Sequence, residues 1–237
     1  VFDEASSVPS WYDGSPFVQV TTSPDWKTVA DWAVADVARA AGAADPLVSK
    51  LAARLDREAG GDDTAYLRLA TRFVQDQIRY MGIEMGPYSQ RPHDPGLVLR
   101  QRYGDCKDKS LLLVTLLRMH RIPACVAFVN ADYGSQLNHY APSAASFNHA
   151  IVSFTWRDSM RWIDPTISYQ RGDVTRGASP DYGYALLVRE GTDSLTPMRA
   201  SQYRRVDIVQ RFTIARGNGT PGTLARSAER RVGKACR

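Results

Sequence analysis

The chain has 237 residues, of which 43% are hydrophobic and 23% are charged, a composition typical of a globular domain. It contains no run of about 18 consecutive apolar residues, so it predicts no membrane-spanning helix. The sequence begins at Val1 and shows no signal peptide, and we therefore expect it to start inside a longer protein.

The net charge of +5 is distributed unevenly along the chain. Residues 1–198 carry 20 Lys+Arg and 23 Asp+Glu, whereas residues 199–237 carry 10 Lys+Arg and 2 Asp+Glu. A basic tail of this kind can bind nucleic acid or anionic lipid. Residues 225–237 lack interleaved aromatic residues and any nucleic-acid motif, which favours a disordered end or a stretch that is not native sequence. We therefore expect no nucleic-acid partner.

Apolar spacing, capping residues and glycine or proline breakers predict helices first and strands afterwards. Helices are expected over residues 23–42 (capped by Ser23 or Asp25), 46–61, 63–82 and 106–119, with a short helix that Asp94 caps before the last of these. Loops are expected over residues 82–95 and 131–146. Strands are expected over residues 123–130, 147–154, 160–164 and 184–188, and a strand, a Gly-rich turn and a partner strand over 203–225.

This order of elements predicts an α+β fold. N-terminal helices and a central buried helix over 106–119, which is apolar nearly all round, would pack on a mainly antiparallel β-sheet. Residues 1–22 would connect from a missing upstream domain, and residues 23–198 would form the main domain. Residues 199–237 would begin a truncated β-rich domain and end in the basic tail.

The three cysteines have no CxxC spacing and do not indicate a disulfide framework. Cys125 lies in an apolar run and is expected in the core, and Cys236 lies in the basic tail. Cys106 differs, because Gly104 and Asp105 precede it and a long apolar run begins shortly after it. We expect Cys106 at a helix N-terminus, where the helix dipole and free N–H groups favour a thiolate and a developing oxyanion.

The charges around Cys106 leave its role open at this point. Asp105 and Asp108 disfavour a thiolate, and Lys107 and Lys109 partly offset them. The alternative to a nucleophile is a loop cysteine beside a capping Asp105.

A cysteine nucleophile needs a base, and the base needs a group that orients it. Among the four histidines, His149 stands out because it opens a predicted strand. The others lie in loops or at a helix end: His93, His120 and His139.

Asp164 closes the strand that follows His149, and the predicted hairpin turn near Arg157 falls about halfway between the two. Hairpin geometry would therefore bring His149 and Asp164 side by side. Taken singly, His149 could be a hydrogen-bonded histidine at a strand end, and Asp164 could simply start a turn. Together with Cys106 they indicate a nucleophile, its base and the group that orients the base.

The stretches YGDCKDKSLLLVTLLR, FNHAIV and WIDPT occur in this order and together resemble the core of the transglutaminase-like superfamily of papain-like cysteine proteins. The resemblance covers roughly residues 20–198. It is nearest to bacterial transglutaminase-like domains of multidomain envelope-associated proteins, in which β-rich domains flank the core. The resemblance implies a transglutaminase/papain-like fold, and an envelope or periplasmic location is implied by it alone.

The resemblance also implies that Cys106 is the nucleophile, His149 the base and Asp164 its orienter. The reaction would be acyl transfer on a peptide or protein amide through a thioester, which water resolves in a peptidase or amidase and an amine resolves in a cross-linking transglutaminase. No cofactor or metal is implied, because the sequence has no carboxylate-rich loop like an EF-hand. The Cys106 N–H would stabilise the oxyanion, and further oxyanion or substrate contacts are sought among Tyr88, Gln90, Tyr103 and Asn148.

Two alternatives stay open beside this reading. A zinc site from Cys106, His93 and His149 would lack the usual CxxC or HExxH spacing. A non-catalytic scaffold of the same fold would bind a protein or peptide without reacting with it. The expected partners are a peptide or protein substrate and flanking β-rich domains of the full-length chain, with no insertion of this segment into a membrane.

Overall fold

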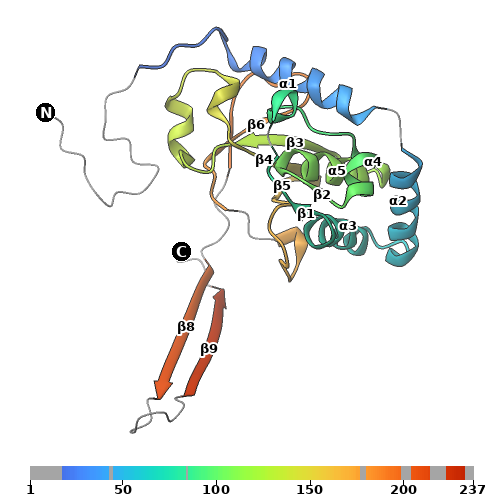
Figure 1. Cartoon of the computed structure of the whole chain (residues 1–237), viewed down its shortest axis with the longest axis vertical. Coiled ribbons are helices and arrows are strands. Elements are labelled where there is room, and N and C mark those ends of the chain that lie inside the picture. The colour runs from blue at the N-terminus through green and yellow to red at the C-terminus, as the bar shows by residue number, and fades with distance from the viewer. Residues whose placement is uncertain are drawn as a thin grey trace, which may run out of the picture. The chain divides into compact units, whose positions relative to one another are not determined.

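The computed structural model describes residues 18–42, 45–83, 85–176, 180–198, 204–213 and 223–232. The chain divides into two units, Val1–Arg199 and Ala200–Arg237. Among the described residues, the first unit contains helices and two β-sheets, and the second contains a β-hairpin (Figure 1).

The five α-helices described in the first unit begin in the same way. The helices are α1 (Trp26–Ala41), α2 (Pro46–Ala59), α3 (Asp63–Gln77), α4 (Pro95–Gln101) and α5 (Cys106–Met119). Each follows an aspartate whose side chain accepts a hydrogen bond from a first-turn N–H group, and these aspartates are Asp25, Asp45, Asp62, Asp94 and Asp105. Such caps satisfy donors that a helix leaves without partners, so the sequence alone could locate the helix starts.

Helix α3 ends at Gln77, five residues before the predicted end at Gly82. Ile78 is extended, and Arg79–Tyr80 form the short strand β1, which pairs in parallel with β2 (Tyr103–Gly104). The Arg79 N–H donates to the carbonyl of Arg102 at 2.8 Å. These ladder bonds with a distant segment replace the helical ones, and for that reason local apolar spacing overestimated the length of the helix.

The main sheet of the first unit has five strands in the order β5-β4-β3-β6-β7, and every neighbouring pair is antiparallel. The strands are β3 (Ala124–Val129), β4 (His149–Trp156), β5 (Ser159–Ile163), β6 (Tyr184–Leu187) and β7 (Thr196–Pro197). Stretches predicted as loops also contain the 3₁₀ helices η1 (Gly86–Ser89), η2 (Gly134–His139) and η3 (Ala144–Ser146), and η4 (Val174–Arg176) follows β5.

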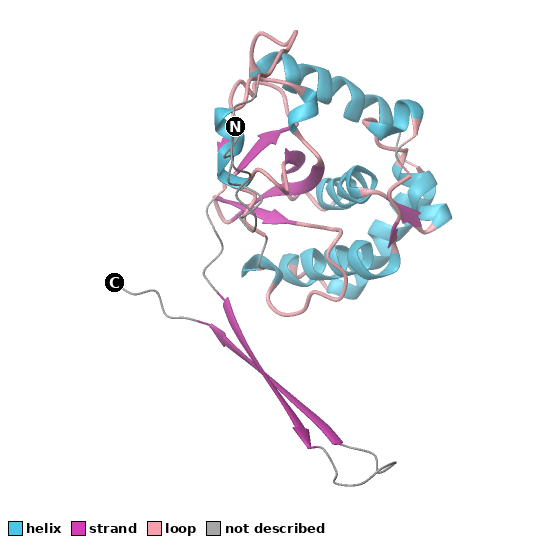
Figure 2. Cartoon of the chain, turned by 60° about the vertical axis from the view of Figure 1, so that its left-hand side comes forward, coloured by secondary structure: helices cyan, strands magenta, loops and turns pink. Residues whose placement is uncertain are grey.

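Helix α5 lies between the sheet and the other helices (Figures 1 and 2). It is buried nearly all round, and its leucines join side chains of α2, α3 and the sheet in the largest apolar cluster. This arrangement confirms the predicted α+β fold with a central buried helix. None of the helices in the described residues is long and apolar enough to cross a membrane.

The second unit contains β8 (Arg204–Thr213) and β9 (Thr223–Val232), which pair as an antiparallel hairpin. The expectation of a disordered end from residue 225 is therefore wrong for residues 225–232, because their backbone pairs with β8. The predicted Gly-rich turn within 214–222, the leading segment 1–17 and Cys236 lie outside the described residues.

Candidate active site

Cys106 is the first residue of α5, directly after the capping residue Asp105. The Asp105 side chain accepts from the N–H groups of Lys107 and Asp108, and the Asp108 side chain accepts from the Asp105 N–H. A Cβ on Gly104 would lie 2.7 Å from the Cβ of Asp108, so this reciprocal cap needs a glycine before the aspartate. The local sequence thus places the Cys106 sulfur at a helix N-terminus.

The charged side chains near Cys106 are paired with partners. Lys107 forms an ion pair with Asp105, and both side chains are buried. Burial, followed by the nearby charge of Asp108, raises the pKa of Asp105, and Lys107 counteracts this. Asp108 accepts the backbone N–H of His93 at 2.7 Å and lies 3.1 Å from its Nδ1 atom. These contacts fix the first turn of α5 and tie the loop before α4 to it.

Lys109 is fully buried, and its side chain reaches the end of α3. Its Nζ donates to the carbonyl of Ile78 at 2.6 Å and to that of Gln75 at 3.4 Å. The Gln75 side chain donates in turn to the carbonyl of Asp164 at 3.0 Å. Burial lowers the pKa of Lys109 to about 8, although the charges of Asp164 and Asp76 oppose the shift. Lys109 therefore links the cysteine-bearing helix to the segment that carries Asp164.

His149 and Asp164 are diagonal neighbours across the β4–β5 hairpin. The two turn residues Arg157 and Asp158 both have positive φ, and the resulting register pairs Val152 with Ile163. If this register continues by one residue, Asp164 lies opposite Ile151. Because Ile151 follows His149 by two residues, His149 and Asp164 lie on the same face of the sheet. The Nε2 atom of His149 lies 2.9 Å from Oδ2 of Asp164.

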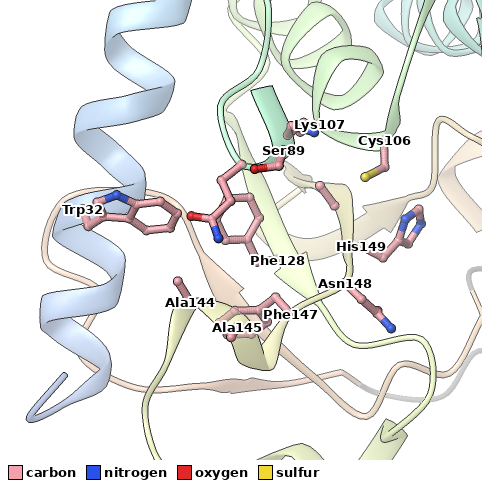
Figure 3. A pocket seen from close by; sticks show the side chains of 12 residues that line it. Trp32, Ser89, Cys106, Lys107, Phe128, Ala144, Ala145, Phe147, Asn148 and His149 are labelled. Atoms are coloured by element: carbon pink, nitrogen blue, oxygen red, sulfur yellow. The ribbon is translucent and has the colours of Figure 1, made fainter. Parts of the chain in front are cut away.

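The electrostatics of this pair favour a charged histidine. Burial lowers the pKa of His149, but hydrogen bonds to Asp164 and Cys106 and their negative charges outweigh burial and raise it to about 9. For Asp164, burial raises the pKa, and the hydrogen bond and charge of His149 outweigh it, so that the pKa is lowered. Nε2 faces Asp164, so Nδ1 is the ring nitrogen available to the Cys106 sulfur, which lies beside the His149 ring in Figure 3.

Two further side chains hold the Asp164 carboxylate. The Tyr182 hydroxyl donates to Oδ2 at 2.7 Å, and Thr166 donates to Oδ1 from its N–H at 2.8 Å and its hydroxyl at 2.6 Å. Sequence reasoning missed Tyr182, because it follows Asp164 by 18 residues and no motif marks it. Thr166 follows Asp164 closely enough for a local turn pattern to have suggested it.

The four residues sought as oxyanion or substrate contacts lie in different places. Gln90 lines a cavity together with Cys106 and His149. Asn148 also lines it, but its side chain bonds to Asp132 and to the N–H of Ala131. Tyr88 stacks on His93 with ring centroids 4.1 Å apart. Tyr103 lies in β2, and the structure does not place it among the residues that line the cavity.

The cavity beside Cys106 and His149 measures about 180 Å³. The residues that line it are Trp32, Ser89, Gln90, Cys106, Lys107, Phe128, Ala144, Ala145, Phe147, Asn148, His149 and Ala150. They come from α1, the loop before α4, α5, β3 and the segment that leads into β4 (Figure 3). These segments are far apart in the sequence, so sequence reasoning could not have assembled the aromatic part of the cavity.

The remaining histidines and the second described cysteine lie elsewhere. His120 stacks on Tyr66 and lies 3.0 Å from both Asp56 and Asp63, and burial raises the pKa of the Cys125 thiol. Within the described part of the chain, no group of three or more His, Cys, Asp or Glu side chains could hold a metal ion. His93, which the zinc alternative requires, is engaged with Asp108.

The fold is of the cysteine-enzyme type, and comparison with known proteins agrees. Residues 49–165 match the family model of the transglutaminase-like superfamily, so they form a domain of that superfamily, as the sequence motifs predicted. No curated protein matches this chain.

Two solved structures are similar to this chain to different degrees. A candidate protease from Parabacteroides distasonis is 16% identical, with a TM-score of 0.57 over 77% of this chain and 32% of that chain. A candidate cysteine protease from Cytophaga hutchinsonii is 15% identical, with a TM-score of 0.37 over 80% of this chain and 53% of that chain. This chain therefore spans about a third of the first protein and about half of the second. The first likeness shows a shared fold.

Proposed function

We propose that the chain catalyses cysteine-dependent acyl transfer on a peptide or protein amide. The observation that carries the proposal is the placement of His149, which lines one cavity with Cys106 and lies 2.9 Å from Asp164. An imidazolium beside the sulfur stabilises the thiolate, which is the nucleophilic form of a cysteine. Membership of the transglutaminase-like superfamily and a fold shared with a candidate protease support the same reading.

In the proposed first step, the Cys106 sulfur attacks the amide carbonyl carbon and forms a C–S bond. The carbonyl oxygen becomes an oxyanion, which the Cys106 N–H can stabilise, because Asp105 accepts from the next N–H groups of the helix instead. The C–N bond then breaks, and His149 transfers its Nδ1 proton to the leaving nitrogen. A thioester remains on Cys106, and Asp164 keeps the imidazole oriented.

In the second step, water or an amine attacks the thioester carbonyl while neutral His149 accepts its proton. The C–S bond breaks and the thiolate–imidazolium pair returns. Water gives peptidase or amidase activity, and a lysine amine gives a cross-link. The cavity opens beside Cys106 and His149 and thus offers a peptide access to both.

The proposal is tested by alkylating the full chain with iodoacetamide between pH 5 and pH 9 and mapping the modified cysteine by mass spectrometry. At pH 6 we expect Cys106 to react at least about tenfold faster in the parent than in His149→Ala, since an isolated thiol is almost wholly protonated there. Cys125 is as buried as Cys106, and burial raises the pKa of its thiol, so it serves as the internal control.

Activity is measured in parallel, as release of ammonia or peptide from a denatured casein substrate, with and without added lysine ethyl ester. Cys106→Ala should abolish the release and keep the far-ultraviolet circular dichroism of the parent. An equal alkylation rate in the parent and His149→Ala would remove the proposal and leave a peptide-binding scaffold as the better reading. Activity that survives Cys106→Ala would remove it too, because Cys106 would then not be the nucleophile.

A further inference from the structure

The cavity extends away from the reacting pair into an apolar region. The apolar side chains that line this region are Trp32, Phe128, Ala144, Ala145 and Phe147. Trp32 lies at the end opposite Cys106 and His149, with the other apolar side chains between them (Figure 3). We call this region, bounded by those five residues, the aromatic pocket.

Contacts with neighbouring rings hold Phe128 and Phe147, which form the floor of the aromatic pocket, in place. The ring of Phe147 lies between those of Trp26 and Phe128, with centroid distances of 5.6 Å and 6.0 Å and tilted planes. Tilted aromatic pairs at these distances are favourable beyond their buried area. Phe128 also packs against the main apolar cluster, so the floor continues the core of the domain.

Polar contacts tie the walls of the pocket to one another. Arg91 of the loop that carries Gln90 donates to Asp36 of α1 at 3.1 Å, and the Asp36 side chain is buried. The Gln19 side chain, in the segment before α1, exchanges two hydrogen bonds with the backbone of Ala141, in the segment before η3, at 2.7 and 3.1 Å. The pocket is therefore formed before any ligand binds, which lowers the entropic cost of binding.

The size of the cavity matches one side chain. An apolar cavity of about 150 Å³ can hold a benzene molecule. The cavity of about 180 Å³ is slightly larger, but it is smaller than the roughly 300–1,000 Å³ of sites that hold drug-sized ligands.

The charge in the cavity is already paired. Its charged lining residues are Lys107, which pairs with Asp105, and His149, which pairs with Asp164. Within the described residues the cavity lining thus offers no unpaired charge to an acidic or basic side chain. An apolar group gains most from entering such a site, because it leaves water without leaving a polar group unsatisfied.

We propose that the aromatic pocket binds an aromatic or long aliphatic side chain of the peptide substrate and so sets specificity. This inference rests on the proposed acyl transfer and names its substrate class. Trp32 of α1 lies outside residues 49–165, which match the superfamily, whereas the other four residues of the aromatic pocket lie within them.

The test compares acetyl-phenylalanine, acetyl-glycine and acetyl-glutamate chloromethyl ketones on the full chain. In each case the Cys106 sulfur displaces chloride and forms a C–S bond, and mass spectrometry follows the reaction. We expect the phenylalanine reagent to react at least about tenfold faster than the other two, which is the scale of discrimination expected from an apolar pocket. Trp32→Ala should reduce this preference severalfold, whereas Trp156→Ala, which removes an indole outside the pocket, should retain it.

Ala145→Phe provides a second variant, because Ala145 is exposed and a ring at this position would fill the pocket with little effect on folding. It should slow the phenylalanine reagent to the rate of the glycine reagent.

Equal rates with all three reagents in the parent, or a preference for glutamate, would overturn the inference. The iodoacetamide rate separates the two proposals: a fast, His149-dependent rate without a phenylalanine preference overturns the aromatic pocket alone. If Cys106 instead reacts with iodoacetamide at the rate of an ordinary thiol, calorimetry of acetyl-phenylalanine amide with Cys106→Ala tests the aromatic pocket independently. Absence of binding would then overturn the inference.

Discussion

The hydroxyl of Tyr182 lies 2.7 Å from Oδ2 of Asp164, the same oxygen that faces Nε2 of His149 at 2.9 Å. Burial, then the charge and hydrogen bond of Asp164, raise the pKa of Tyr182, so its hydroxyl stays protonated and donates. Thr166 supplies two donors to the other oxygen. The carboxylate is thus held on both oxygens, and its orientation toward the imidazole is fixed.

Tyr182→Phe should lower the free energy of unfolding by about 1.5–3 kcal/mol, because it removes a buried hydrogen bond to a charged acceptor. Tyr66→Phe is the matched control, since the buried Tyr66 hydroxyl donates to the neutral carbonyl of Leu116 at 2.9 Å and should contribute about 1 kcal/mol. Urea denaturation at pH 7 measures both. A Tyr182 variant as stable as the parent would show that the Asp164 carboxylate does not need this donor.

The His149–Asp164 pair should make stability depend on pH in a definite direction. The folded pKa of His149 is about 9 against an ordinary 6.5, so its contribution is complete below pH 6.5 and is lost as the pH rises through 9. The folded pKa of Asp164 lies below the ordinary 3.8, so its contribution is present above that value and is lost as the pH falls through the folded pKa. The pair therefore contributes most between about pH 4 and pH 6.5.

The measurement is the difference in the free energy of unfolding between the parent and His149→Gln at pH 5, 7, 8 and 10. We expect this difference to shrink by up to about 3 kcal/mol from pH 5 to pH 10. The lowered pKa of Lys109, about 8, makes stability rise with pH between about 8 and 10.5. Both proteins contain Lys109, so its contribution cancels in the difference. A difference that is constant with pH would contradict a charged His149 in the folded state.

Lys109→Met should destabilise the domain by about 2–4 kcal/mol, because it removes the buried ammonium that donates to the carbonyls of Ile78 and Gln75. Lys27→Met is the matched control, since Lys27 forms an exposed ion pair with Asp31 and should contribute less than about 1 kcal/mol. Urea denaturation compares the two variants. Equal effects would mean that the buried ammonium adds nothing beyond a surface charge.

Gly104→Ala should destabilise the domain by about 1–3 kcal/mol, because its Cβ would lie 2.7 Å from the Cβ of Asp108 and force the first turn of α5 to shift. The alkylation rate of Cys106 should fall in the same variant, as the sulfur moves with that turn. Gly82→Ala is the control, since the nearest atom to its Cβ would be 3.7 Å away. If stability fell but the alkylation rate did not change, the helix cap would not be what positions the Cys106 sulfur.

The local parts of this structure could be predicted because short-range chemistry decides them. Asp105 before an apolar run predicted both the start of α5 and the place of Cys106 within it. The hairpin spacing predicted that His149 and Asp164 meet, although the register makes them diagonal rather than directly opposed. Residues 63–82 show the limit of such reasoning, because pairing between β1 and β2 ended α3 where the apolar period continued.

The amino-acid sequence by itself therefore determined the helix caps, the positions of the strands and the order of the three site residues, all of which depend on neighbours in the chain. Only the tertiary structure decided which distant groups surround them. Tyr182 reaches Asp164, Lys109 reaches the end of α3, and Trp32 reaches the cavity beside Cys106 through packing between elements. Such contacts follow from the three-dimensional course of the backbone, and no residue spacing in the sequence encodes them.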